Sequence, residues 1–279
     1  DADADPAVGA IVVTGAGDRA FSVGADLREM ADDSPAGAHS RSTRTHAVFT
    51  RLEHLRTPVI AAINGLALGG GCELAIHCAR RVAHMETYIG FVEVGVGLLP
   101  AGGGLTYVAR RAAELATAAG ASADLFAFLK EPFTAAAMAK VGTSAIEGRK
   151  LGYLIDGDIV VAHKDELLHV ATTQVKAMAE SGWHPPARTL FPVAGRSAIA
   201  TIKGQLTNLR DGGFASAHDF HIATLIAEVV CGGDVDAGSL VNEEYLMTLE
   251  RDRFCALLEH PKTQERIMGM LQTGKPVRN

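Results

Sequence analysis

Two glutamates stand in apolar, glycine-rich surroundings and could carry acid–base chemistry. Glu73 follows the glycine triplet 69–71 at the start of an otherwise apolar helical pattern, and Glu93 lies in the apolar stretch 89–95. A carboxylate among apolar neighbours is unfavourable unless it has a partner or a chemical task. Either glutamate alone is more simply explained as a structural carboxylate within a polar network. Two of them, each beside glycines, indicate a pair that could accept and donate protons.

Two groups of glycines could bring a ligand close to backbone amides. Residues 69–71 precede a short helical pattern through Cys78, and residues 102–104, which follow Pro100, precede a helical pattern through Leu115. Glycine ahead of a helix lets a ligand approach the exposed amides of the helix N-terminus. We therefore expect both places to be open to a ligand.

Other chemistries fit these residues less well. Residues 15–20 match a GxGxxA pattern, but the helix that a dinucleotide fingerprint requires does not follow it. Glu73 and His77 are four residues apart on one helix, with Cys78 adjacent, yet no third ligand has a recognisable spacing, and no metal is expected. Cys72 is more simply a small packing residue than a nucleophile, because no activating partner is evident.

The elements that would position these residues alternate between strands and helices. Continuous apolar or β-branched runs predict buried strands, and a helical pattern covers 43–55. The predicted strands are 11–14, 58–63 and 158–161. Because strand, loop and helix alternate, the sequence indicates an α/β fold.

Helical patterns dominate the later part of the chain. They cover 197–209, 217–230 and 243–258, and a shorter one ends near Leu271. We expect a catalytic core over residues 1–190 and an all-helical appendage over 191–279. Apolar residues recur in the appendage at helical spacing, which is typical of packing rather than of a site.

Composition excludes several functional classes. The chain has 279 residues, of which 48% are hydrophobic, enough to bury a large core. Its net charge is -6 and its basic residues are scattered, which argues against a nucleic-acid partner. Its apolar runs are too short or too interrupted to span a bilayer, and its four cysteines lack CxxC spacing. We therefore expect a cytoplasmic protein in a reducing compartment.

Three motifs together resemble those of the crotonase (enoyl-CoA hydratase/isomerase) superfamily, in the family order. Residues 20–27 (AFSVGADL) are similar to its CoA loop, residues 58–74 (PVIAAINGLALGGGCEL) to its central signature, and residues 90–104 to the segment with its second acid. The resemblance implies a crotonase fold, with a ClpP-like spiral ββα core, over roughly residues 9–115.

The same resemblance implies roles for individual residues. The backbone amides of Ala25 and Gly70 would form an oxyanion hole, and Glu73 and Glu93 match the two family acids that hold the reacting water. The acyl-CoA substrate would be bound near Val23, Ala25, Asp26 and Arg28, although Arg28 could equally be a solvated surface residue. Because a family isomerase often needs only the acid that matches Glu93, the presence of both acids favours hydration of a 2-enoyl-CoA. No cofactor is implied beyond the coenzyme A carried by the substrate.

The second half of the chain has a narrower resemblance. Residues 137–145, 182–186, 242–246 and 274–279 are similar to the carboxyl-terminal region of long bacterial fatty-acid oxidation enzymes. In those enzymes a 3-hydroxyacyl-CoA dehydrogenase part precedes the crotonase part. The resemblance implies a C-terminal piece of a two-activity β-oxidation protein, N-terminally incomplete because the first strand and helix of the family are missing. Any NAD would belong to the preceding dehydrogenase part, which would also be a partner.

Two alternatives to hydration remain open. One is isomerisation of an enoyl-CoA, and the other is a non-catalytic acyl-CoA-binding or assembly module whose amino-terminal portion lies elsewhere. Crotonase relatives usually form trimers or pairs of trimers, so the resemblance also implies a homo-oligomer. The appendage would then cover the core or contact the dehydrogenase part.

Overall fold

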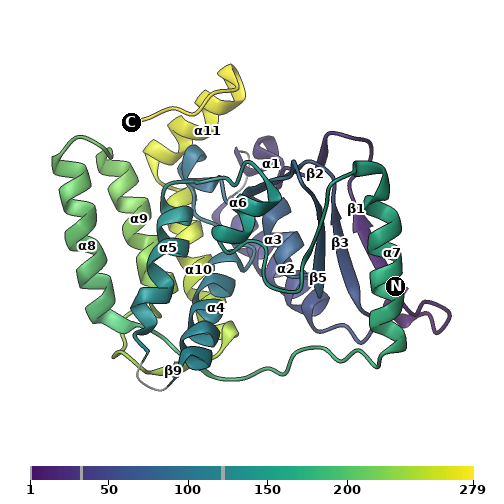
Figure 1. Cartoon of the computed structure of the whole chain (residues 1–279). Helices are drawn as coiled ribbons and strands as arrows, with labels where there is room; N and C mark the ends of the chain where they lie inside the picture. The colour runs from purple at the N-terminus through teal and green to yellow at the C-terminus, as the bar shows by residue number, and fades with distance from the viewer. Residues whose placement is uncertain (1, 32–33, 121–122) are drawn as a thin grey trace. The chain divides into compact units, whose positions relative to one another are not determined.

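The computed structural model describes residues 2–31, 34–120 and 123–279, and the chain forms two compact units. The first unit comprises Asp1–Ala25, Ala47–Gly90 and Val141–Ala187, and the second comprises Asp26–His46, Phe91–Lys140 and Arg188–Asn279. Figure 1 labels the α-helices and several of the strands. Each unit combines separate segments of the chain. This division does not test the boundary predicted at residue 190, which stays a prediction.

Two parallel sheets form the centre of the first unit. The four-stranded sheet has the order β1 (Ile11–Thr14), β3 (Val59–Ile63), β5 (Arg80–His84) and β7 (Ile159–Val161). The three-stranded sheet has the order β2 (Ala20–Ser22), β4 (Leu66–Leu68) and β6 (Tyr88–Gly90). Along the chain, each of the first three strands of one sheet leads directly into a strand of the other, and α3 (Gly70–Ile76) follows the second such pair. This is the predicted crotonase spiral.

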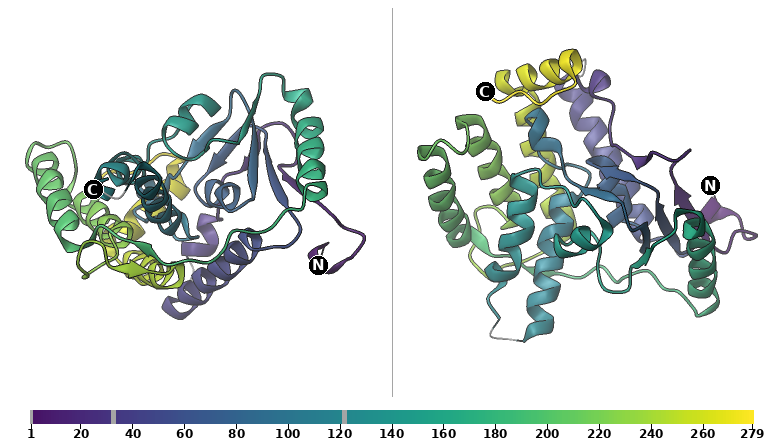
Figure 2. Two further views of the ribbon diagram at one scale, coloured as in Figure 1. Left: turned by 60° about the horizontal axis from the view of Figure 1, so that its bottom comes forward. Right: turned by 45° about the horizontal axis from the view of Figure 1, so that its top comes forward.

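Apolar packing holds a helix on the four-stranded sheet. Helix α7 (Leu167–Glu180) lies along one face of this sheet (Figures 1 and 2). Ile60 and Val82 from the strands are buried together with Ala171 and Val175 from the helix. The strands predicted at 11–14, 58–63 and 158–161 are confirmed, with shifts of at most one residue at their starts. The remaining helical segments of this unit are η1 (Ala2–Ala4), the end of α2 (Pro35–Glu53), α6 (Ala145–Lys150) and η3 (Lys164–Glu166).

A buried ion pair ties strand β5 to the start of strand β7. Arg81 Nε donates to Asp158 Oδ2 at 2.8 Å, and both side chains are almost fully buried. The other carboxylate oxygen, Asp158 Oδ1, accepts the backbone N–H of Arg81 at 2.9 Å. The carboxylate of Asp158 therefore stabilises the pairing of these two strands and is not a surface charge.

We expect Asp158→Ala to lower the free energy of unfolding by about 3 to 5 kcal/mol, because it leaves a buried guanidinium without its carboxylate. Asp234→Ala is the matched control, since Asp234 pairs with Arg196 where both side chains are largely exposed. That change should cost less than about 1 kcal/mol. Denaturant unfolding of both variants measures the difference, and equal losses would contradict this account.

The second unit is mostly helical. Its helices are α1 (Leu27–Ala31), the start of α2 (Pro35–Glu53), η2 (Glu93–Val96), α4 (Gly104–Ala119), α5 (Leu125–Ala137), α8 (Gly195–Asp211), α9 (Ala217–Val230), α10 (Glu243–Leu258) and α11 (Pro261–Thr273). Helices α8 and α9 lie side by side (Figures 1 and 2). The helices predicted after residue 190 are confirmed.

Two features of this unit differ from the sequence prediction. The region after residue 190 also contains an antiparallel pair of two-residue strands, β8 (Phe191–Pro192) and β9 (Leu240–Val241), which are too short to show an alternating pattern. Helix α2 begins at Pro35 rather than near residue 43. The earlier start places Ala38, Ser42 and His46 on one buried face at four-residue spacing. The polar sequence before residue 43 therefore belongs largely to the helix.

In the part of the chain that the structure describes, no helix has the length and apolar character needed to cross a membrane.

Candidate active site

Two loops of the first unit bring the amides of Ala25 and Gly70 close together. A Cβ atom placed on Gly70 would lie 3.8 Å from Ala25 N, and one placed on Gly24 would lie 2.9 Å from Gly70 N. Gly24 has a φ of +90°, a conformation that L side chains rarely adopt. Glycine at position 24 therefore permits the contact between the loop after β2 and the start of α3. Two neighbouring N–H groups of this kind could stabilise negative charge on one carbonyl oxygen.

The glycine triplet lets helix α3 approach strand β2. A Cβ on Gly71 would collide with the backbone oxygen of Ser22. Gly69 N donates to Gly90 O at 2.9 Å, which ties the same loop to strand β6. The three glycines thus fix where the Gly70 amide lies.

Glu73 lies in the first turn of α3, close to Gly70. Its side chain is buried, with 4% of the residue exposed, and its Oε2 lies 4.0 Å from where a Cβ on Gly70 would be. A carboxylate and the two candidate oxyanion donors therefore belong to one part of the first unit.

His77, four residues after Glu73, has its Nδ1 2.7 Å from Glu73 O and its ring 5.4 Å from that of Phe49. Among the described residues, no cluster of three potential ligands could hold a metal ion.

Glu93 begins the short turn η2 of the second unit. Its Oε2 accepts the Val92 N–H at 2.8 Å. Burial raises the pKa of Glu93 to about 7, the charge of Glu250 adds to the rise, and hydrogen bonds from the Glu93 and Val92 amides oppose it. Both protonation states therefore coexist near neutral pH, which suits a group that donates or accepts protons.

The second glycine group does not leave helix α4 open to a ligand. Glu250 is fully buried, and its carboxylate accepts Gly103 N at 2.6 Å, Thr106 N at 3.0 Å and Thr106 Oγ1 at 3.2 Å. His46 Nε2 lies 3.0 Å from the same carboxylate. The expectation that a ligand approaches these amides is wrong, because a side chain of the protein already caps the helix.

Glu250 lies on the buried face of α10 with Leu246, Met247, Phe254 and Leu257. That spacing is a signal from which its burial could have been predicted.

The residues predicted to contact the acyl-CoA are exposed. Val23 is 58% exposed, and Ala25, Asp26 and Arg28 also lie at the surface. Asp26 Oδ1 accepts the Arg28 N–H at 2.9 Å, at the start of α1. Val23 and Ala25 belong to the first unit, whereas Asp26 and Arg28 belong to the second. Their role in binding remains a prediction.

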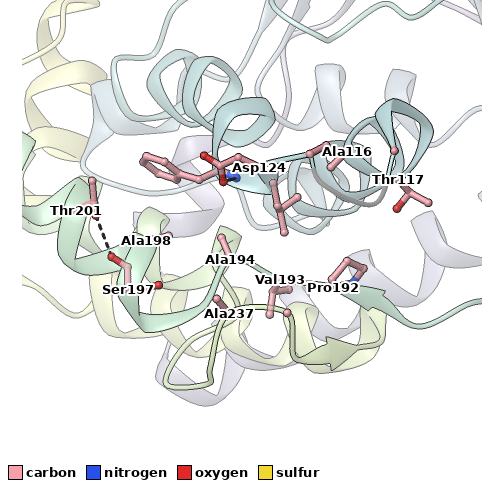
Figure 3. Close-up of a pocket in the computed structure, with 15 residues that line it drawn as sticks. Ala116, Thr117, Asp124, Pro192, Val193, Ala194, Ser197, Ala198, Thr201 and Ala237 are labelled. Atoms are coloured by element: carbon pink, nitrogen blue, oxygen red, sulfur yellow. Dashed lines mark hydrogen bonds between the residues drawn. The ribbon is translucent and has the colours of Figure 1, made fainter.

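A cavity of about 800 Å³ lies elsewhere in the second unit, where residues near the end of α4 and the start of α5 face the first turns of α8 (Figure 3). Its lining is mainly small and apolar. Two of its polar side chains have local partners: Asp124 Oδ1 accepts Phe126 N at 3.0 Å, and Thr201 Oγ1 donates to Ser197 O at 3.1 Å. None of the predicted site residues lines the cavity, and we assign it no chemistry.

Known proteins show the family and the fold to which the chain belongs. Residues 1–143 match the enoyl-CoA hydratase/isomerase family, and the chain belongs to that family. A probable 3-hydroxyacyl-CoA dehydrogenase of Bacillus subtilis (strain 168) is 36% identical over 267 residues, which are 93% of this chain and 33% of the relative. The short-chain-enoyl-CoA hydratase of Clostridium acetobutylicum is 43% identical over 106 residues, which are 38% of this chain and 41% of the relative. The chain thus spans less than half the length of both curated relatives.

A solved structure shows the same fold. The enoyl-CoA hydratase of Bacillus halodurans aligns over 96% of this chain and 84% of its own, with a TM-score of 0.61 and 16% identity. At that identity the match supports the fold alone. The predicted resemblance to the crotonase superfamily is confirmed, and the match to the longer Bacillus subtilis relative agrees with the predicted resemblance to long oxidation enzymes.

Proposed function

We propose that the chain adds water across the double bond of a 2-enoyl-CoA thioester. The observation that carries the proposal is the meeting of the Ala25 and Gly70 amides beside the carboxylate of Glu73. Family membership, and a relative named as a short-chain-enoyl-CoA hydratase, support the same reaction. The acid with the raised pKa, Glu93, supplies the second group that the chemistry requires.

In the proposed reaction Glu73 acts as the base and Glu93 as the acid. The Glu73 carboxylate takes a proton from water while the water oxygen forms a bond to C3. The π electrons of the double bond move toward the carbonyl, and negative charge collects on the thioester oxygen. Protonated Glu93 then gives its proton to C2, and the product is a 3-hydroxyacyl-CoA. We assign the acid role to Glu93 because its pKa of about 7 leaves much of it protonated near neutral pH.

The Ala25 and Gly70 amides are assigned to the enolate-like oxygen. Donors fixed before the reaction act only where charge develops, so they lower the barrier without holding the substrate more tightly. Removal of one such donor from an enzyme typically costs about 2.7 to 4 kcal/mol of transition-state stabilisation. Because both donors are backbone groups, only substitution by proline would remove one, and it would also restrict the backbone there. The glutamates are therefore the cleaner targets for mutation.

The product suggests a place for this chain in a longer protein. A 3-hydroxyacyl-CoA is the substrate that a 3-hydroxyacyl-CoA dehydrogenase oxidises, and the Bacillus subtilis relative is named as a probable enzyme of that type. This chain covers 33% of that relative. We infer that the hydratase is coupled to a dehydrogenase part on one polypeptide, as in fatty-acid β-oxidation, and that NAD would be bound by that part.

The experiment supplies the chain with a 2-enoyl-CoA and, separately, with a 3-enoyl-CoA. Hydration removes the absorbance of the conjugated thioester, whereas isomerisation of the 3-enoyl substrate creates it. We expect loss of absorbance with the first substrate. Formation of conjugated product without hydration would favour an isomerase, and calorimetric binding of acyl-CoA without turnover would favour a non-catalytic module.

A further inference from the structure

The turn that carries Glu93 is held by helix α11 at the carboxyl end of the chain. Arg266 Nη1 donates to Val94 O at 3.1 Å, and Thr263 Oγ1 donates to Gly97 O at 2.7 Å. Val94 is the next residue after Glu93, and Gly97 ends the same turn. Two side chains of one helix therefore hold one backbone carbonyl within this turn and one at its end.

Both anchoring side chains are themselves fixed. Arg266 is 2% exposed, forms an ion pair with Asp219 at 2.8 Å, and donates to Ser216 Oγ at 3.2 Å and to Asn279 Oδ1 at 2.9 Å. A planar guanidinium with this many partners has little freedom to move. The anchor thus joins the turn to the start of α9 and to the last residue of the chain.

A histidine fixes the hydroxyl of Thr263. His218 Nε2 lies 3.0 Å from Thr263 Oγ1. Burial, together with the charge of Arg266, lowers the pKa of His218 to about 4, so the ring is neutral near neutral pH. Since Thr263 Oγ1 donates its only proton to Gly97 O, it accepts from His218 Nε2–H. The hydroxyl therefore has both a donor and an acceptor and a defined direction.

The backbone of α11 also lies directly against the turn. Gly97 has a φ of +82°, and a Cβ placed there would lie 2.8 Å from Thr263 Cα. No larger residue fits without displacing α11 or the turn. A shift of α11 would therefore move the backbone that carries Glu93.

We propose that Thr263 and Arg266 are positioning residues for Glu93, through their hydrogen bonds to the turn η2. The inference rests on the proposed hydration. It means that the appendage supports the reaction by holding Glu93 in place, although it contains no catalytic residue. Because the reacting groups must lie within a fraction of an ångström of their productive places, loss of this hold lowers turnover more than it lowers substrate binding.

Two substitutions of Thr263 separate positioning from packing. Thr263→Val keeps the volume of a fully buried side chain and removes the hydroxyl, whereas Thr263→Ser keeps the hydroxyl and removes a methyl group. We expect Thr263→Val to lower kcat for 2-enoyl-CoA hydration about tenfold or more with little change in KM, and Thr263→Ser to stay near the wild type. A simple packing role predicts the reverse order, because the serine leaves a cavity.

A second readout does not depend on turnover. Carbon-13 NMR can follow the titration of the Glu93 carboxyl, and the signal is assigned by its loss in Glu93→Gln. In Thr263→Val we expect the pKa of Glu93 to fall from about 7 toward its ordinary value, because a loosened turn admits water to a group whose pKa is raised mainly by burial. Glu250, whose charge also raises this pKa, is unchanged in the variant.

Arg266→Lys tests the second side chain that holds the turn, and it replaces the first variant if Thr263→Val does not fold. It keeps the positive charge facing Asp219 but cannot reproduce the guanidinium contacts, so kcat and the pKa of Glu93 should fall again. Unchanged kcat and unchanged Glu93 titration in these variants would overturn the proposal, as would an equal loss in Thr263→Ser and Thr263→Val. Absence of hydration by the wild type would instead refute the proposed function, and the Glu93 titration alone would then decide the positioning role.

Discussion

Glu73→Gln and Glu93→Gln should each lower kcat for hydration of a 2-enoyl-CoA by ~10²- to 10⁴-fold, the range typical of general acid–base groups. An amide at position 73 cannot accept a proton from water, and an amide at position 93 cannot deliver one to C2. Both substitutions nearly preserve side-chain volume, so the fold should survive. The decrease in absorbance of the conjugated thioester measures the rate.

The pH dependence follows from the same assignment. Because the proposed proton donor is the protonated form of Glu93, kcat/KM in the wild type should fall as pH rises through about 7.

Glu86→Gln is the matched control for the two glutamate substitutions, since Glu86 is exposed and has no part in the proposed chemistry. A loss of less than about tenfold in either Glu73→Gln or Glu93→Gln would contradict general acid–base roles.

Glu250→Gln should lower the free energy of unfolding by about 3 kcal/mol or more, although the two side chains have nearly the same shape. Both carboxylate oxygens face donors: Oε1 accepts Gly103 N, and Oε2 accepts Thr106 N and Oγ1. A glutamine must direct its NH₂ group toward one of these donors. The substitution therefore leaves a buried clash of hydrogens in place of a helix cap, and denaturant unfolding followed by circular dichroism measures the loss.

Glu259→Gln provides the comparison for this variant. Glu259 is exposed and lies at the end of the same helix, α10. Its replacement should change stability by no more than about 0.5 kcal/mol. Similar unfolding curves for Glu250→Gln and the wild type would contradict the account of Glu250 as the buried cap of α4.

The local elements of the fold could be predicted because their signals are local. The strands predicted at 11–14 and 58–63 are continuous apolar or β-branched runs, as is typical of a parallel sheet. Strand β3 is buried along its whole length, whereas β1 is only partly buried. The helices 217–230 and 243–258 show helical spacing and begin at side-chain caps, Ser216 and Asn242. For such segments pattern and cap chemistry agree with the tertiary structure.

The contacts around Glu93 could not be predicted because they depend on distant parts of the chain. Arg266 lies 172 residues from the carbonyl of Val94 that it binds, and Glu250 lies 147 residues from Gly103. Helical spacing predicts that α10 and α11 are packed, but it does not say which polar group a buried side chain meets. The sequence therefore does not show that Glu250 caps α4, and its prediction that the amides of α4 are open to a ligand is wrong.

The most direct test of the proposed hydration follows the oxygen of water into the product. The chain is incubated with a 2-enoyl-CoA in ¹⁸O-labelled water, and the thioester product is analysed by mass spectrometry beside the same reaction with Glu73→Gln. The account predicts a 3-hydroxyacyl-CoA that carries one ¹⁸O atom at C3 with the wild type and nearly none with the variant. Unlabelled, unchanged enoyl-CoA after incubation with folded wild-type protein that binds the thioester would contradict it.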